Sequence, residues 1–246
     1  MNLFDLTGKK AIVTGSCQGL GRSIAEGLAQ AGASVCLMDL NPDCAAVAQE
    51  MSAGGLAFEG VTADLTDRKD LERGFLEAVS KLGGLDILVN NAGISFVGLL
   101  QDMSDAQWSE ILNTNLSSVF YCCRSAIGHM VSQKSGKIIN ISSMWGTVGA
   151  SCEAAYSATK SGMNGLTKAL AKELAPSNVQ VNAIACGVID TAMNAQFSEE
   201  EREALREEIP AGRFADSEEV AALALTLASG HSYLTGQIIG LDGGYI

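Results

Sequence analysis

Short apolar runs alternate with amphipathic segments along the whole chain of 246 residues. An apolar run bounded by glycine or polar residues predicts a buried strand, whereas apolar residues spaced three and four apart predict a helix. The runs that predict strands are residues 10–14, 34–38, 56–61, 86–90, 137–141, 179–185 and 237–241. Because strands and helices alternate without a linker or repeat, we expect a single α/β domain over residues 1–246. Its expected fold is a Rossmann-type doubly wound parallel sheet of about seven strands flanked by helices on both faces.

Capping signals mark several of the expected helix starts. A Ser-Asp-Ala-Gln capping box opens a long helix over residues 104–130. Asn41 and Pro42 predict the N-cap and the first residue of another helix. Ser198 and Asp216 each precede acidic residues and predict two further helices. Helical spacing also covers residues 68–82 and 153–175.

Gly15, Gly19 and Gly21 lie between the first predicted strand and the first predicted helix. Glycines there allow a tight turn and a close approach to a pyrophosphate, whose charge is met by free N–H groups and the helix dipole. A glycine triplet alone is weak evidence, but this one has a strand before it, a helix after it and Asp39 about 20 positions further on.

Asp39 ends the second predicted strand, where a carboxylate accepts hydrogen bonds from the adenosine ribose and repels a 2′-phosphate. Residues 16–18 and 40–41 contain no arginine or lysine to neutralise such a phosphate. The sequence therefore predicts NAD(H), not NADP(H), as the cofactor. The less favoured alternative is that Asp39 only caps a helix or is solvated.

Tyr156 and Lys160 share one face of the helix predicted over residues 153–175, since they stand at i and i+4. A nearby ammonium favours phenolate, so we expect Lys160 to lower the pKa of Tyr156 toward that of a general acid/base. Ser143 lies at the end of the fifth predicted strand, where reacting groups gather in open α/β sheets. Such a Tyr–Lys pair alone is usually part of a solvated helix face, and only a cofactor site elsewhere in the chain makes a catalytic role the better interpretation.

Composition excludes several classes of function. The net charge of −12 argues against binding to nucleic acid or to an anionic membrane surface. No apolar run is long enough for a membrane span and the first residues do not resemble a signal peptide, so a cytoplasmic protein is expected. The 7 cysteines lack a C-x-x-C pair and are expected to be reduced packing thiols. With only 2 histidines, no metal site is predicted.

Taken together, these motifs resemble the short-chain dehydrogenase/reductase family over residues 3–245. The matching segments are Thr14-Gly-x-x-x-Gly-x-Gly21, Asn90-Asn91-Ala92-Gly93, Asn115, Ser143 and Tyr156-x-x-x-Lys160. Each motif is weak alone, and their occurrence in order and at family spacing is specific.

The resemblance implies a catalytic set of Asn115, Ser143, Tyr156 and Lys160. Tyr156 would exchange the hydroxyl proton, and Ser143 would bind the substrate oxygen. Lys160 would hold the nicotinamide ribose, and Asn115 would position a water that relays protons to it. The residues implied at the cofactor are Gly15, Gln18, Gly19, Leu20, Gly21, Asp39, Asp64, Leu65, Asn91, Ala92, Gly93, Tyr156, Lys160, Gly187, Ile189 and Thr191. The implied reaction is metal-free hydride transfer between NAD(H) and a secondary alcohol or ketone.

Three substrate classes stay open. Residues 209–214 and 233–237 resemble 3-oxoacyl-carrier-protein reductases, which usually use NADPH, whereas residues 4–9 with Asp39 resemble NAD-dependent sugar-acid and polyol dehydrogenases. Hydroxysteroid dehydrogenases share every motif. The candidate pocket residues, which could equally be packing residues, are Trp145, Cys152, Met193 and Phe197. A catalytically silent dinucleotide sensor is the alternative of another class, and the intact catalytic residues count against it.

Cys186 stands where members of the family usually have proline. Without the ring, the backbone regains an N–H and freedom in φ, so we expect altered loop rigidity and retained activity. A substrate loop is expected around residues 188–215. The resemblance also implies a homotetramer in which the helices over 104–130 and 153–175 pack on their counterparts.

Overall fold

A single seven-stranded sheet forms the centre of the computed structural model, which describes residues 4–191 and 198–246. The strand order is β3-β2-β1-β4-β5-β6-β7 and every pairing is parallel. The strands are β1 (Lys10–Thr14), β2 (Ser34–Asp39), β3 (Phe58–Thr62), β4 (Ile87–Asn90), β5 (Gly136–Ser143), β6 (Val179–Cys186) and β7 (Ile238–Leu241). The order reverses between β1 and β4, so this doubly wound sheet has its ligand-binding switch point there. The predicted fold is confirmed.

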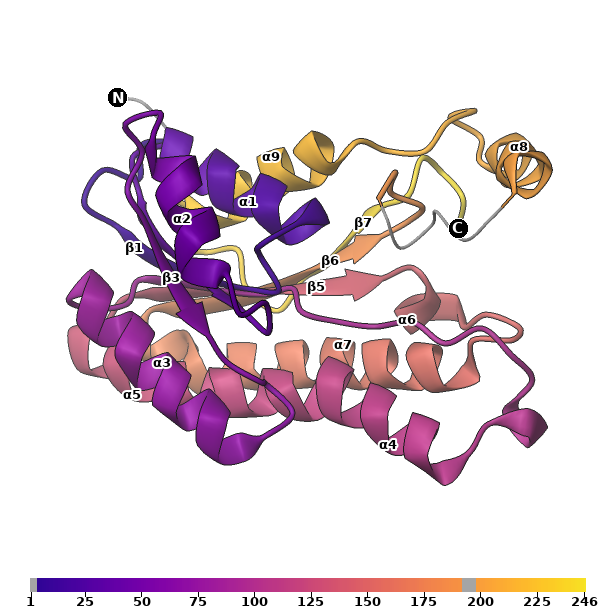
Figure 1. Ribbon diagram of the computed structural model, residues 1–246, viewed down its shortest axis with the longest axis horizontal. Coiled ribbons are helices and arrows are strands. Elements are labelled where there is room, and N and C mark those ends of the chain that lie inside the picture. The colour runs from indigo at the N-terminus through magenta and orange to yellow at the C-terminus, as the bar shows by residue number, and fades with distance from the viewer. Residues whose placement is uncertain (1–3, 192–197) are drawn as a thin grey trace.

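Helices cover both faces of the sheet (Figure 1), with α1, α2 and α9 on one side and α3, α4, α5 and α7 on the other. Their bounds are α1 Gly19–Gln30, α2 Cys44–Ser52, α3 Arg68–Leu82, α4 Asp105–Leu112, α5 Ser118–Gln133, α6 Trp145–Val148, α7 Ala154–Leu174, α8 Glu199–Glu208 and α9 Ser217–Ala228. Short helical turns cover Leu100–Asp102, Asn113–Ser117 and Ala175–Ser177.

The core consists of two apolar layers, one on each face of the sheet. In the first, Ile24 and Leu28 of α1 pack with Val220 of α9. In the second, Phe75 of α3 and Met130 of α5 lie in one cluster with β-strand residues. Both faces of the strands are covered, which explains why the strands have continuous apolar runs instead of alternating polar residues.

Helix α2 starts later than the sequence predicts. Asn41 was expected at its N-cap, but the helix begins at Cys44. The reason is local: the Asn41 side chain accepts a hydrogen bond from the Asp43 N–H at 2.9 Å, and its carbonyl accepts one from the Cys44 N–H at 3.1 Å. These bonds close a turn that stands before the helix.

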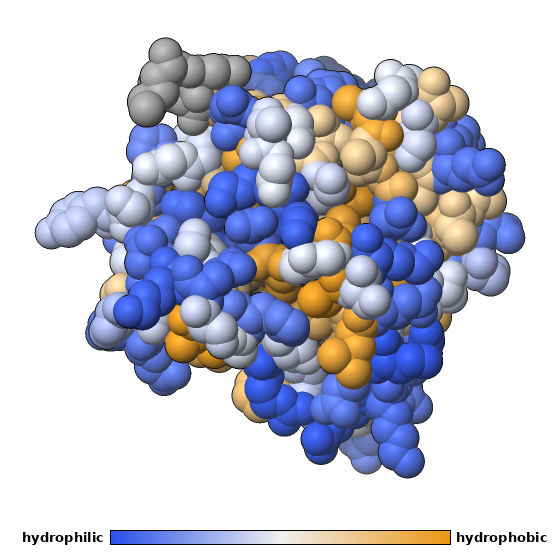
Figure 2. All heavy atoms as spheres, turned by 90° about the vertical axis from the view of Figure 1, so that its left-hand side faces the viewer, coloured by the Kyte–Doolittle hydropathy of each residue, from blue (hydrophilic) through white to orange (hydrophobic). Residues whose placement is uncertain are grey.

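All strands point their carboxyl ends toward the same edge, on the right in Figure 1, where α6 and α8 also lie. Ser143 and Cys186 are directly paired at the last register position of β5 and β6. The opposite end of the molecule, where the strands begin, is mostly hydrophilic with apolar groups in between (Figure 2). Parallel topology thus gathers the sequence motifs at one end of the molecule.

Candidate active site

The glycine loop is closed by contacts that exclude any larger side chain. A Cβ on Gly15, which has φ +62°, would lie 2.8 Å from the Ala92 Cα. A Cβ on Gly21 would collide with the Gly15 carbonyl oxygen and lie 2.5 Å from the Asn91 Nδ2. These glycines therefore let α1 approach β1 and the turn after β4 far more closely than other residues would.

The N-terminus of α1 has no capping side chain, since Gln18 at its N-cap makes no side-chain cap hydrogen bond. By contrast, Asp67 caps α3 and Ser104 caps α4. The first N–H groups of a helix need partners, and a pyrophosphate supplies them. The uncapped terminus and the glycine cradle fit a dinucleotide.

Asp39 lies beside the glycine loop, at the end of β2. Its carboxylate accepts hydrogen bonds from the Cys17 N–H at 2.9 Å and from the Asn41 N–H at 3.0 Å. These bonds fix the orientation of the carboxylate, and each oxygen retains a lone pair for another donor. Arg22, the cation that follows in α1, is directed to Glu26 at 3.0 Å. A carboxylate held in this way can accept hydrogen bonds from ribose hydroxyls.

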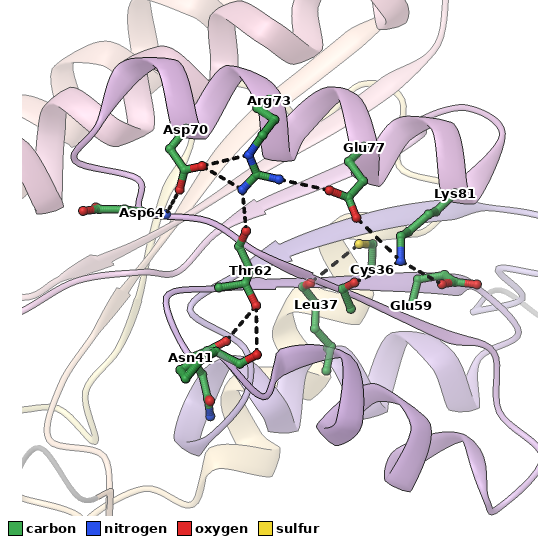
Figure 3. Close-up of polar contacts among 12 residues, drawn as sticks. Cys36, Leu37, Asn41, Glu59, Thr62, Asp64, Asp70, Arg73, Glu77 and Lys81 are labelled. Atoms are coloured by element: carbon green, nitrogen blue, oxygen red, sulfur yellow. Dashed lines mark hydrogen bonds and ion pairs between the residues drawn. The ribbon is translucent and has the colours of Figure 1, made fainter.

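A polar network that sequence reasoning missed positions Asp64 (Figure 3). The Asp64 N–H donates to Asp70 at 2.7 Å, and Arg73 donates to both Asp70 at 2.7 Å and the Thr62 carbonyl at 2.8 Å. The Thr62 hydroxyl in turn donates to the Asn41 carbonyl at 2.9 Å. Exposed ion pairs add little stability, but these bonds tie the end of β3 to the end of β2. The next residue after Asp64, Leu65, is buried.

The strip after β4 is bonded to β1 through Thr14. The Thr14 hydroxyl accepts from the N–H groups of Asn91 and Ala92 at 3.0 and 3.1 Å, and the Asn91 side chain donates to the carbonyls of Thr14 and Gly15. A Cβ on Gly93 would lie 3.7 Å from the Lys160 Nζ. Residues 91–93 therefore connect the glycine loop with the predicted catalytic residues.

Ser143, Tyr156 and Lys160 come together at the end of β5. The Lys160 Nζ lies 5.5 Å from the centre of the Tyr156 ring and donates to the Ile141 carbonyl at 2.8 Å. The Ser143 hydroxyl accepts from the Trp145 N–H at 3.1 Å and also interacts with the Tyr156 phenol. Ser143, at the end of β5, and Tyr156, on α7, thus face the same space.

Asn115 joins this group through a π-helical turn, Asn113–Ser117, that the sequence pattern does not predict. Its side chain accepts from the Ile94 N–H and donates to the Ile94 carbonyl, both at 2.8 Å. The side chain is fully buried. A π turn inside a helix commonly marks a functional site, and here it interrupts the helix expected over residues 104–130.

The pKa expectation for the tyrosine needs correction. Burial raises the pKa of Tyr156 above its usual value, and Cys186 and then Glu153 add to this, while the hydrogen bond with Ser143 acts in the opposite direction. Burial also lowers the pKa of Lys160 to about 8. Burial thus dominates the pKa of this group, and without cofactor Tyr156 is a neutral phenol.

The predicted pocket residues have diverse surroundings. Trp145 packs edge-on against Tyr245, with ring centres 5.7 Å apart. Cys152 has φ +63°, and its carbonyl accepts from the Gly98 N–H at 2.8 Å. Met193 and Phe197 lie outside the described residues.

The segment after β6 lies beside the end of β7. The Gly187 N–H donates to the Leu241 carbonyl at 2.9 Å, and a Cβ on Gly187 would lie 2.6 Å from the Asp242 Cα. Ile189 is buried and forms a β-bridge with Ala215. Thr191 is partly buried at the end of this described segment. Gly187, Ile189 and Thr191, three of the predicted cofactor residues, therefore lie in the segment that follows the carboxyl end of β6.

The fold and this site define a dinucleotide-binding α/β oxidoreductase. A family model for short chain dehydrogenase matches residues 9–202. The chain is 44% identical over 242 residues to 3-oxoacyl-acyl-carrier-protein reductase FabG from Aquifex aeolicus, covering 97% of this chain and 98% of that protein. The corresponding reductase from Thermotoga maritima is 38% identical over 243 residues, covering 98% and 99% of the two chains. The chain belongs to the short-chain dehydrogenase/reductase family.

Solved structures agree with this assignment. A gluconate 5-dehydrogenase from Burkholderia cenocepacia in complex with NADP and tartrate has a TM-score of 0.95 at 32% identity, covering 99% of this chain and 97% of that one. A dehydrogenase/reductase from Sinorhizobium meliloti has a TM-score of 0.92 at 36% identity, with 99% and 97% coverage. Among the described residues, no helix is long and apolar enough to cross a membrane.

Proposed function

We propose that the protein is an NAD(H)-dependent oxidoreductase acting on a secondary alcohol or ketone, with a substrate half like that of 3-oxoacyl reductases. The observation that carries the proposal is the convergence of Ser143, Tyr156, Lys160 and Asn115 beside the glycine cradle. These side chains come from the end of β5, from helix α7 and from a π turn. Packing alone gives no reason for so many polar groups to meet there.

The residues divide the catalytic work. When bound, the nicotinamide supplies or accepts the hydride. Tyr156, a neutral phenol in the free protein, donates a proton to the carbonyl oxygen during reduction, and Ser143 holds that oxygen. Lys160 binds the nicotinamide ribose through its ammonium. Asn115 positions a water that passes a proton to Lys160, so that the proton given up by Tyr156 is restored.

The preference for NAD(H) rests on Asp39. A carboxylate fixed by two backbone N–H groups cannot turn away from a 2′-phosphate, so the phosphate would meet an unneutralised negative charge. The solved gluconate 5-dehydrogenase holds NADP, so the NAD(H) assignment rests on Asp39 of this chain and not on its relatives. The other proposed cofactor residues are those of the glycine loop, Asp64, Leu65, residues 91–93 and the segment from Gly187 to Thr191.

Two observations support a proposal for the substrate class: the relatives and the surface near the site. The reductase from Aquifex aeolicus acts, by its name, on a 3-oxoacyl group carried by acyl carrier protein. Val97, Leu99 and Val148 are exposed on the segments that flank the site, where they offer apolar contacts to an acyl chain. The gluconate 5-dehydrogenase favours a sugar-acid or polyol substrate as the second candidate. A hydroxysteroid is the third candidate substrate.

Assembly and location complete the proposal. Trp108 of α4 and Phe120 of α5 are 40% and 45% exposed, large apolar side chains that a homotetramer would cover. We also propose that the enzyme is cytoplasmic and that residues around 188–215 form a substrate loop. Sedimentation at micromolar concentration tests the assembly.

The deciding experiment compares NADH and NADPH across a panel of 3-oxoacyl thioesters, sugar acids, polyols and steroids. We expect kcat/KM to be higher with NADH by at least about tenfold, because repulsion of the 2′-phosphate costs more than 1.4 kcal/mol. Comparable values with both cofactors would refute the NAD(H) assignment. Tight NADH binding without turnover of any compound would instead favour the silent sensor.

A further inference from the structure

Glu153 is a carboxylate at the mouth of the site that the catalytic scheme does not use. It precedes α7 as its N-cap residue and stands three positions before Tyr156, so both lie on the same side of the first turn. Its charge acts on the Tyr156 phenol and contributes to raising the pKa of that group. Its place at the N-cap of α7, three residues before Tyr156, puts the carboxylate near the reacting hydroxyl, where it can influence what binds.

The surroundings of Glu153 hold the carboxylate but do not neutralise it. The Ser95 hydroxyl donates to its Oε2 at 3.5 Å, and the Gly98 N–H donates to the neighbouring Cys152 carbonyl at 2.8 Å. These two bonds join the two segments that flank the site. Within residues 4–191 and 198–246, no lysine or arginine forms an ion pair with Glu153.

Partial burial makes this unpaired charge effective. Glu153 is only partly exposed, so water screens it less than it screens a surface carboxylate. An anionic group brought to the same space would be repelled, whereas an uncharged group that donates a hydrogen bond would be accepted. The apolar side chains of Val97, Leu99 and Val148 around the opening add no positive charge.

We propose that Glu153 is a specificity-determining residue that selects uncharged ketones, with an apolar or hydrogen-bond-donating substituent, and rejects substrates bearing a carboxylate two or three bonds from the reacting carbon. This inference rests on the proposed ketone/alcohol chemistry and deepens it. Of the open substrate classes, it favours neutral acyl or sterol-like ketones over sugar acids.

The test uses two pairs of ketones that differ in charge: acetoacetate and its methyl ester, and 4-oxopentanoate and its methyl ester. We expect wild type to prefer each ester in kcat/KM with NADH. Glu153→Gln, which keeps the shape but removes the charge, should reduce that preference by about tenfold or more. Ser95→Ala should change it in the same direction by a smaller factor, because the carboxylate loses its fixed orientation.

Glu173→Gln is the matched control, since Glu173 is exposed near the far end of the same helix, about 30 Å away. It should leave the ester preference unchanged. A purely structural role of Glu153 would change both members of a pair equally. Turnover of the esters with an unchanged ratio in Glu153→Gln would overturn this inference alone. Absence of turnover of all four ketones by wild type would overturn this inference, and the proposed function falls with it only if no compound of the panel of thioesters, sugar acids, polyols and steroids is turned over either.

Discussion

The adenosine side and the substrate side of this site are built in different ways. On the proposed adenosine side, short hydrogen bonds join side chains to the backbone: the Asp39 carboxylate binds the Cys17 N–H at 2.9 Å, and the Asn91 side chain binds the carbonyls of Thr14 and Gly15 at 3.0 and 2.9 Å. On the substrate side, the bond between Ser95 and Glu153 is long, at 3.5 Å. The adenosine side is thus specified by backbone geometry, whereas the substrate side depends on which side chains face the opening.

The difference explains why motifs reveal the cofactor more readily than the substrate. A glycine that must be glycine is visible in a sequence, because nothing else fits. A pocket wall accepts many apolar side chains, such as the exposed Leu99 and Val148. Four variants test this contrast, starting with Tyr156.

Tyr156→Phe should give the largest effect. Removing the hydroxyl removes the general acid while leaving the ring in place, so kcat should fall by about 10²–10⁴-fold. NADH affinity, measured by fluorescence titration, should be unchanged, because Lys160 and the glycine loop are intact. Tyr233→Phe is the control, since Tyr233 is fully exposed, and it should retain full activity. Normal turnover in Tyr156→Phe would show that another residue moves the proton.

Gly21→Ala should break the adenosine side specifically. The new Cβ would collide with the Gly15 carbonyl, and overpacking of this kind costs about 1–3 kcal/mol, which weakens NADH binding by roughly 5- to 150-fold if the loop moves. Gly27→Ala lies in the same helix, where a Cβ would meet Ala221 at an ordinary 3.5 Å, and it should bind NADH like wild type. Equal NADH affinity of the two variants would contradict the proposed role of the close approach.

The pH dependence of NADH binding should report on Lys160. Burial lowers its pKa in the free protein to about 8, so the ammonium is half deprotonated near pH 8, is almost fully present well below that pH and is lost as the pH rises through it. The dissociation constant of NADH should therefore increase above pH 8, approaching about tenfold per pH unit. Lys160→Met should lack this dependence. Lys137, whose pKa is also lowered to about 8 but which donates to the His231 carbonyl, provides the control: Lys137→Met should keep it.

Cys186→Ala should have the smallest effect. Burial raises the pKa of this thiol to about 12, so at neutral pH it is a protonated packing group with no nucleophilic role. We expect kcat/KM to change by less than about threefold, under about 1 kcal/mol. A large loss with an unchanged melting temperature would assign Cys186 a direct part in the reaction.

The sequence by itself determined the order of strands and helices, because apolar runs and helical spacing are local properties of the chain. It also predicted α3 with its observed bounds, Arg68–Leu82, and the N-caps at Ser104, Ser198 and Asp216. The glycine loop and Asp39 were predicted for the same reason: their spacing within one βαβ unit fixes where they meet.

Only the tertiary structure decided what depends on contacts between distant segments. The π turn that carries Asn115 forms because its side chain satisfies both backbone groups of Ile94, which no local pattern reveals. The pKa of Tyr156 was predicted to fall but is raised, since burial of the phenol depends on the whole fold. The place of Glu153 also depends on the whole fold. Packing sets the position of its carboxylate relative to Tyr156, and the surrounding residues, among those that the structure describes, supply no cation that neutralises its charge.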